Sequence, residues 1–335
     1  MKNKEYTFKL ITPIFSYGAD NRKHAESAIR TTSIKGMMRY MFRIAQPMLS
    51  SKELFDLENK LFGDAKDQTS PVRLAITFPP NAEIKPSQFL LHKPKGEKKP
   101  IIPRETFKVR MSLRPNLKCP SELNKKQNEN LNEEELLNWY QSLLELSFLL
   151  IGLGQRSRKG RGCAWNSEKK IMNINEVKNE ILCYLNKINV DKNKIYKFDD
   201  EDKKNKINLC VESVHKRPFI EKVEFGKAVK KQKSKEAWEV LLKKIDWTSH
   251  DIKERDQQKK LKHASRSENG KYYSATGSGT PRFSSSIIVS AVETTDGLLP
   301  IYTCVKAVVK NDVLDAKKEW QTFISKIEGN GGGGS

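Results

Sequence analysis

The feature that most constrains the fold is the change of side-chain period along the first half of the chain. Residues 6–12 alternate apolar and polar side chains, as a strand with one buried face does. From Ile34 onward apolar residues recur at helical spacing, with Ser33 as the expected N-cap and Pro47 as the stop. The same reasoning predicts a second short helix at 52–62, strands at 72–78 and 105–113, a helix at 133–151 and a last strand from 163. Strand, helix, strand, strand, helix, strand is the order of the ferredoxin-like, RRM-like fold.

The second half repeats this pattern more loosely. It predicts helices at 176–186, 234–245 and 312–327, and strands at 207–215, 284–292 and 299–309, but it contains no clear last strand. The charge-rich stretch 199–205 is the best candidate linker. We therefore expect an α+β protein with two ferredoxin-like domains in tandem, the second degenerate, at 1–170 and 171–330. Residues 331–335 read GGGGS, a flexible linker composition, and lie outside the fold argument.

The charge balance points to a polyanionic partner. Lysine and arginine number 62 and aspartate and glutamate 41, which gives a net charge of +21 and a pI near 9.6. Such a field attracts nucleic acid, although lysines that only solubilise a surface would produce the same total. The five cysteines are scattered, which fits reduced thiols in a cytoplasmic protein better than disulfides or a zinc site. Because no run of about 18 apolar residues occurs, no membrane contact is expected.

A glycine-rich loop at 152–162 reads GLGQRSRKGRG and follows the predicted helix at 133–151. Glycine lets a backbone approach a ligand closely, and arginine binds phosphate through two N–H groups. Nucleotide-binding glycine loops instead stand between a strand and a helix, and this one lacks the lysine-threonine ending of a Walker loop. The loop therefore predicts contact with an RNA backbone, with a merely exposed basic turn as the alternative.

The second motif, at 30–43, reads RTTSIKGMMRYMFR. On a helix that begins near Ser33, the side chains of Lys35, Arg39 and Arg43 form one basic stripe. The N–H groups at such a helix start can also bind a phosphate. An ordinary amphipathic helix with a solvated basic face is the alternative interpretation.

Together the two motifs resemble the RAMP superfamily of CRISPR proteins, in which a helix of the pattern Ser-x-Lys-Gly-x-x-Arg follows the first strand and a glycine-rich loop follows the second helix. The resemblance covers residues 1–170 well, and within the family it is greatest to a subunit that caps one end of the type III-B effector. It implies a non-catalytic subunit near the 3′ end of the guide RNA (crRNA) in antiviral defence, with target RNA and other RAMP subunits as further partners and no cofactor. The residues expected to contact RNA are Ser33, Lys35, Arg39, Arg43, Gly154, Arg156, Ser157, Arg158, Lys159, Arg161 and Arg282.

Two further functions remain open at this stage. Backbone subunits of the family can carry an aspartate after the first strand for metal-assisted RNA cleavage, and Asp20 lies at that place, although aspartate also favours turns. Other nucleases of the family use a histidine general base, for which His24 is a candidate by type. A metal-dependent endoribonuclease acting through Asp20 is thus the first alternative, and a free-standing basic RNA-binding protein is the second.

Overall fold

The structure is a computed structural model that describes most of the chain. Three of the expected site residues, Asp20, His24 and Arg282, lie outside the described residues, and so does the GGGGS segment. The described residues are 2–16, 29–64, 68–77, 87–88, 97–98, 103, 105–115, 120–123, 132–191, 193–199, 205–232, 235–259, 276, 284–309, 312–314 and 316–329.

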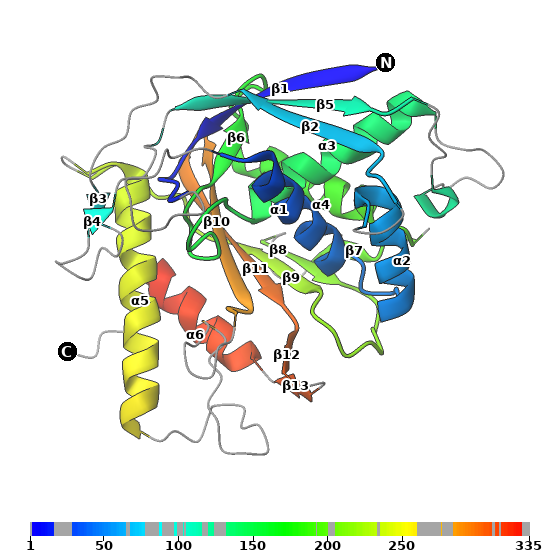
Figure 1. Cartoon of the computed structure of the whole chain (residues 1–335). Coiled ribbons are helices and arrows are strands. Elements are labelled where there is room, and N and C mark those ends of the chain that lie inside the picture. Colours follow the sequence, from blue (N-terminus) through cyan, green and yellow to red (C-terminus); the bar gives the residue numbers. More distant parts are fainter. Residues whose placement is uncertain are drawn as a thin grey trace.

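The first sheet is antiparallel and has the strand order β2-β5-β1-β6. Its members are β1 (Asn3–Leu10), β2 (Val72–Thr77), β5 (Thr106–Leu113) and β6 (Ala164–Asn166). The first strand of the chain lies between the third and the fourth of this sheet, which is the arrangement of a ferredoxin-like domain. The predicted fold class is confirmed for this half (Figure 1).

The side chains of this sheet alternate between core and surface as predicted. In β1, Phe8 is buried and pairs with Phe107 of β5, while the next residue, Lys9, is on the other face. The ring of Phe148, on the helix beneath, lies 4.4 Å from that of Phe8 between centroids. The outer face carries Glu5, whose carboxylate binds the charged ends of Lys108 and Arg110 of β5.

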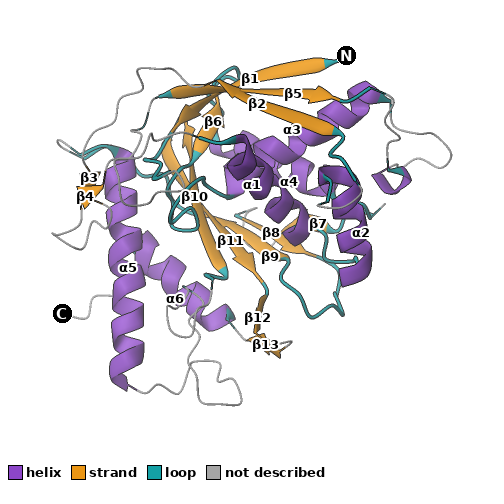
Figure 2. Ribbon diagram, viewed as in Figure 1, coloured by secondary structure: helices purple, strands orange, loops and turns teal. Residues whose placement is uncertain are grey.

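Three helices lie between the first sheet and a second one (Figure 2). They are α1 (Thr31–Ile44), α3 (Glu133–Leu150) and α4 (Ile174–Ile188), and α2 (Ser51–Phe62) packs beside α1. Because α3 contacts strands of both sheets, it is apolar around most of its circumference rather than along one stripe.

The second sheet explains why no last strand was found in the sequence. Its order is β10-β11-β9-β8-β7, all antiparallel. The run β9 (Ile220–Phe225), α5 (Ala237–Lys259), β10 (Ile287–Thr294), β11 (Gly297–Val305), α6 (Lys317–Glu328) follows the ferredoxin-like order, with β9 beside β11. The place of a fourth strand beside β9 is taken by β8 (Lys206–Leu209), which comes earlier in the chain and pairs with β7 (Tyr196–Phe198). The second domain is therefore degenerate, as predicted, because a preceding strand replaces its last one.

Several predicted bounds were wrong. The strand expected at 207–215 ends at Leu209, and β7 and β9 were not predicted. The helix expected from 312 begins at Lys317, because Asp312–Leu314 (β13) pairs with Ala307–Val309 (β12). Ser33 is not an N-cap, since α1 begins at Thr31 after Arg30, which makes no side-chain capping bond. The remaining short elements are β3 (Ser87–Gln88), β4 (Glu97–Lys98) and the 3-10 turn Ser121–Leu123.

Candidate nucleic-acid interface

The backbone of the glycine-rich loop is bonded to both halves of the protein. Its ends pair with each other, since the Leu153 N–H donates to the Gly162 carbonyl at 2.9 Å. The Gly162 N–H donates to the carbonyl of Pro13, just beyond β1, at 3.0 Å. On the opposite side the Gly160 N–H donates to the carbonyl of Val289 in β10 at 2.9 Å. The loop thus bridges the strand that leaves the first sheet and the edge of the second sheet.

The glycines of this loop are required by protein packing. A Cβ on Gly162, whose φ is +68°, would lie 2.0 Å from the Leu153 carbonyl oxygen, and one on Gly160 would lie 2.9 Å from Ile245 of α5. Sequence reasoning gave these glycines the task of letting RNA approach. That interpretation is wrong for Gly154, Gly160 and Gly162, because atoms of the same chain occupy the space a side chain would need.

The basic residues of the loop divide into an inward and an outward group. Arg161 is 1% exposed, and its guanidinium donates to the Asp246 carboxylate of α5 at 2.6 Å. The predicted contact of Arg161 with RNA is wrong, because its charge is neutralised inside the protein. Lys159 is also buried, with its ammonium 4.8 Å from the centroid of the Phe323 ring. Arg156 shares Asp246 at 3.0 Å but remains 26% exposed along its side chain.

Arg158 belongs to the outward group and connects the loop to α1. Its guanidinium carbon lies 4.6 Å from the ring centroid of Tyr40 in α1, and its Nη1 donates to the Ser285 carbonyl at 2.6 Å. Arg158 and Ser157 are half-buried, and Gly154 is exposed. The Tyr40 contact fixes the guanidinium plane at the edge of α1.

The predicted basic stripe of α1 is present, and a buried carboxylate organises two of its members. Glu58 of α2, only 3% exposed along its side chain, accepts from Arg39 Nε at 2.7 Å and from Arg43 Nη2 at 2.6 Å. The side chains of Arg39 and Arg43 remain 31% and 51% exposed. One carboxylate thus orients two guanidinium groups and leaves one net positive charge at the surface.

Lys35 is the most unusual group of the stripe. Burial lowers the pKa of its ammonium below the ordinary value, and the neighbouring charges of Arg39 and Arg114 lower it further. No described residue pairs with this ammonium through a hydrogen bond or an ion pair. A half-buried cation among other cations is stabilised by an anion, so this position favours a phosphate.

Two further features keep the surface of α1 open. A Cβ on Gly36 would meet nothing within 4 Å, so protein packing does not require glycine there. The first turn of the helix carries no acidic residue, which leaves its N–H groups and the positive end of its dipole uncompensated by side chains of that turn. The term basic face is used below for Ser33, Lys35, Gly36, Arg39 and Arg43 of α1 with Gly154, Ser157 and Arg158 of the loop.

The sequence did not identify Tyr40, Arg114 and Asp246 as parts of this site. Tyr40 stands within the predicted helix but was given no role, and Arg114 reaches Lys35 only through the packing of α1 on the first sheet. Asp246 follows Arg161 by 85 residues, so no local pattern joins them.

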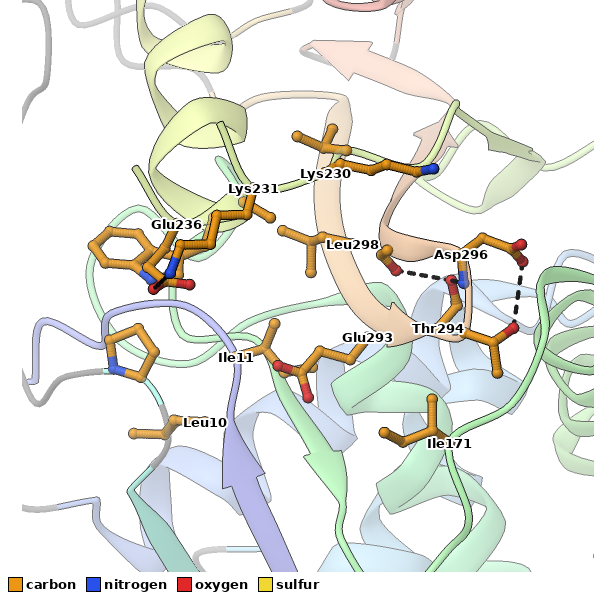
Figure 3. Close-up of a pocket in the computed structure, with 16 residues that line it drawn as sticks. Leu10, Ile11, Ile171, Lys230, Lys231, Glu236, Glu293, Thr294, Asp296 and Leu298 are labelled. Carbon is orange, nitrogen blue, oxygen red and sulfur yellow. Dashed lines mark hydrogen bonds and ion pairs between the residues drawn. The ribbon is translucent and has the colours of Figure 1, made fainter. Parts of the chain in front are cut away.

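A pocket of about 640 Å³ lies elsewhere, at the seam of the two halves (Figure 3). It is lined by the end of β1, the turn between β10 and β11, and the first turn of α5. Its charges are of both signs, with Lys231 bound to Glu236 at 2.9 Å and Glu293 bound to Lys9 at 3.0 Å. None of the predicted RNA contacts lines it.

Within the described ranges, no group of three or more His, Cys, Asp or Glu residues is placed to hold a metal ion. Of the helices in the same ranges, none is both long and apolar enough to cross a membrane.

Comparison with known proteins connects this geometry to a family. Residues 7–165, from β1 to β6, match the family model described as the RAMP superfamily. The chain carries a RAMP domain. The predicted resemblance is therefore confirmed, and the RAMP domain coincides with the first sheet, its helices and the glycine-rich loop.

Solved structures resemble the whole chain and not only the RAMP domain. Cmr1 from Pyrococcus furiosus superposes with a TM-score of 0.50 at 16% identity, over 97% of this chain and 96% of that one. A chain of the type III-B Cmr-beta complex bound to cognate target RNA gives 0.57 at 13% identity, over 96% and 98%. At such identities the likeness shows the fold, including the degenerate second half. No curated protein sequence matches the chain significantly.

Proposed function

We propose that this chain is an RNA-binding subunit of a type III-B CRISPR effector, and that its basic face holds the sugar-phosphate backbone of the guide RNA near the 3′ end. The observation that carries the proposal is Lys35, a half-buried cation beside Arg39 and Arg114 with no described anionic partner. The RAMP match and the likeness to Cmr1 and to a chain of the target-bound Cmr-beta complex support the same assignment.

The proposed role is to bind and position RNA without cleaving it. The basic face consists of guanidinium, ammonium, hydroxyl and glycine groups, which bind and orient phosphates. In an incubation of labelled RNA with the purified chain and divalent metal, we expect no cleavage and no effect of Asp20→Ala. Cleavage that disappears in Asp20→Ala would favour the endoribonuclease alternative instead.

Binding is tested with a fluorescently labelled single-stranded RNA, by anisotropy at several salt concentrations. Each phosphate neutralised on a single strand contributes about 0.7 to the slope of log affinity against log salt. Lys35→Ala should therefore weaken binding and reduce that slope by about 0.7, the contribution of one phosphate. Lys108→Ala is the matched control, because it removes a lysine from the outer face of the first sheet. Equal losses in both variants would mean that RNA binds to the general field of the protein and not to the basic face.

Assignment to an effector complex has its own test. Co-expression with the other effector subunits and a guide RNA should yield a complex that contains this chain, with the guide 3′ end cross-linking to the basic face. RNA binding by the isolated chain without incorporation would favour the free-standing alternative.

A further inference from the structure

An exposed aromatic side chain stands on α2, the helix whose Glu58 binds two arginines of the basic face. Phe55 of α2 is 62% exposed, whereas the other large apolar residues of that helix are buried: Leu54, Leu57, Leu61 and Phe62. Packing within the chain therefore does not account for a phenylalanine at this position.

The position of Phe55 on α2 places it beside the arginines. Residues three apart lie next to each other on a helix, and three residues after Phe55 comes Glu58, which holds Arg39 and Arg43. One turn further along the same side, the guanidinium of Arg39 lies 6.0 Å from the ring centroid of Phe62. Phe55, Glu58 and Phe62 thus follow one another along one side of α2, and Phe55 is the exposed one of the three.

The direction of the chain indicates which arginine is nearest to Phe55. Helix α1 ends at Ile44 and α2 begins at Ser51, so the last turn of α1 lies near the first turns of α2. Arg43, in the last turn of α1, is the more exposed of the two arginines. The acidic neighbour Asp56 projects about 100° away around the helix, so it does not face this row.

We propose that Phe55 is a stacking platform for an unpaired base of single-stranded RNA whose phosphates contact Arg39 and Arg43. This inference rests on the proposed function, and it adds the class of RNA that the face selects, since only an unstacked base can lie on the ring. Proteins that bind single strands combine a basic track with aromatic platforms, and one base on a ring improves affinity by roughly tenfold.

The test compares two ligands that have the same sugar-phosphate backbone. One is a labelled single-stranded RNA, and the other is the same strand without its bases. Phe55→Ala should weaken binding to the RNA roughly tenfold and leave binding to the abasic strand unchanged. Phe55→Leu should behave like Phe55→Ala, because it keeps an apolar side chain but lacks the ring. In Phe55→Trp, affinity should be retained, and the added tryptophan fluorescence should be quenched by the RNA but not by the abasic strand. Ile171→Ala, which truncates a 55% exposed apolar residue elsewhere, is the matched control.

The outcomes separate this inference from the proposed function. If Phe55→Ala binds RNA like the unaltered protein while Lys35→Ala does not, stacking is refuted and the basic face stands. Equal losses on both strands would also refute stacking, since they would indicate contact with the backbone. Normal RNA affinity combined with loss of Phe55→Ala from the assembled complex would instead identify a protein contact. Failure of the unaltered protein to bind RNA would overturn the proposed function and this inference with it.

Discussion

Asp246 is the residue on which the inward group of loop arginines converges. Its side chain is fully buried and binds both Arg156 and Arg161. Asp246→Asn leaves the buried Arg161 charge without its carboxylate, and breaking such a buried pair costs about 3–5 kcal/mol. Urea unfolding measures this loss. Asp251→Asn on the same helix removes a partly exposed partner of Lys326 and should cost at most about 1 kcal/mol. Similar losses in the two variants would show that Asp246 is not a special anchor.

Lys35 gives the basic face a pH dependence that its arginines cannot provide. In the protein without RNA, burial and neighbouring cations lower the pKa of this ammonium below 10.5, the ordinary value for lysine. The ammonium therefore loses its proton at a lower pH than an ordinary lysine does. A bound phosphate favours the charged form and raises that pKa again, so binding is coupled to protonation. Affinity should therefore fall with increasing pH on the alkaline side of neutrality, and the fall should be smaller in Lys35→Arg. Anisotropy with a 2′-O-methyl strand, which resists alkaline cleavage, measures both profiles. Parallel profiles in the two proteins would exclude Lys35 as the titrating group.

At the scale of elements, two glycines of the predicted motifs should respond in opposite ways to alanine. Gly36 lies within α1 with nothing near its Cβ position, so Gly36→Ala should stabilise the protein by about 0.5–1 kcal/mol. The new methyl group would stand on the basic face, so RNA affinity should fall while stability rises. Thermal unfolding and anisotropy on one preparation test both effects. Unchanged affinity would mean that RNA does not approach α1 closely at this point.

Gly162 should be intolerant of the same change. Its φ of +68° and the 2.0 Å separation of a built Cβ from the Leu153 carbonyl oxygen force the loop backbone to move. Gly162→Ala should lower the free energy of unfolding by more than about 2 kcal/mol, and urea unfolding measures this change. If Gly162→Ala destabilises the protein less than an ordinary surface substitution does, the loop backbone can shift freely.

The elements that sequence reasoning placed best are those that begin with a readable cap. Helices α2 and α3 each start at a capping box, formed by Ser50 and Asn132 with a glutamate three residues later, and both starts were predicted to within one residue. Helix α4 also starts at a capping box, at Asn173, but its start was predicted two residues late. Helix α1 lacks such a cap, and its start was predicted three residues late. Strand β9 was not predicted, since two adjacent charged residues, Glu221 and Lys222, stand between its apolar residues Ile220 and Val223 and break the period of two that identifies a strand.

The candidate site was predictable only where its chemistry is local. The stripe of Lys35, Arg39 and Arg43 follows from helical spacing, and the structure bears out its geometry. The orientation of the loop side chains was not predictable, because it depends on Asp246 and Val289 in the second half of the chain. Arginines that are close together in the sequence therefore have different roles, because partners far away in the chain hold Arg161 inside the protein and Arg158 at its surface.

At the scale of the whole molecule, the two ferredoxin-like units share one core. The Ser290 hydroxyl of β10 donates to the Leu149 carbonyl of α3 at 2.5 Å, and the Gln46 amide after α1 donates to the Ile188 carbonyl at 2.9 Å. Arg217, ahead of β9, is mostly buried and donates to the Leu49 carbonyl at 2.7 Å. The units proposed at 1–170 and 171–330 thus meet through hydrogen-bonded, buried surfaces, where independent domains would be joined by a linker with few contacts.

We therefore expect the chain to unfold in a single cooperative transition. Circular dichroism and tryptophan fluorescence should give coincident urea curves, and the calorimetric and van't Hoff enthalpies should agree. A fragment of residues 1–170 should not fold alone, because the side of α3 that contacts β10 and β11 would be exposed to water. Two resolved transitions, or a fragment with native-like cooperativity, would contradict the shared core. The coupling also has a functional consequence: since Arg158 touches Tyr40 of α1 and Ser285 of the second half, any loosening between the units should weaken RNA binding at the basic face as well.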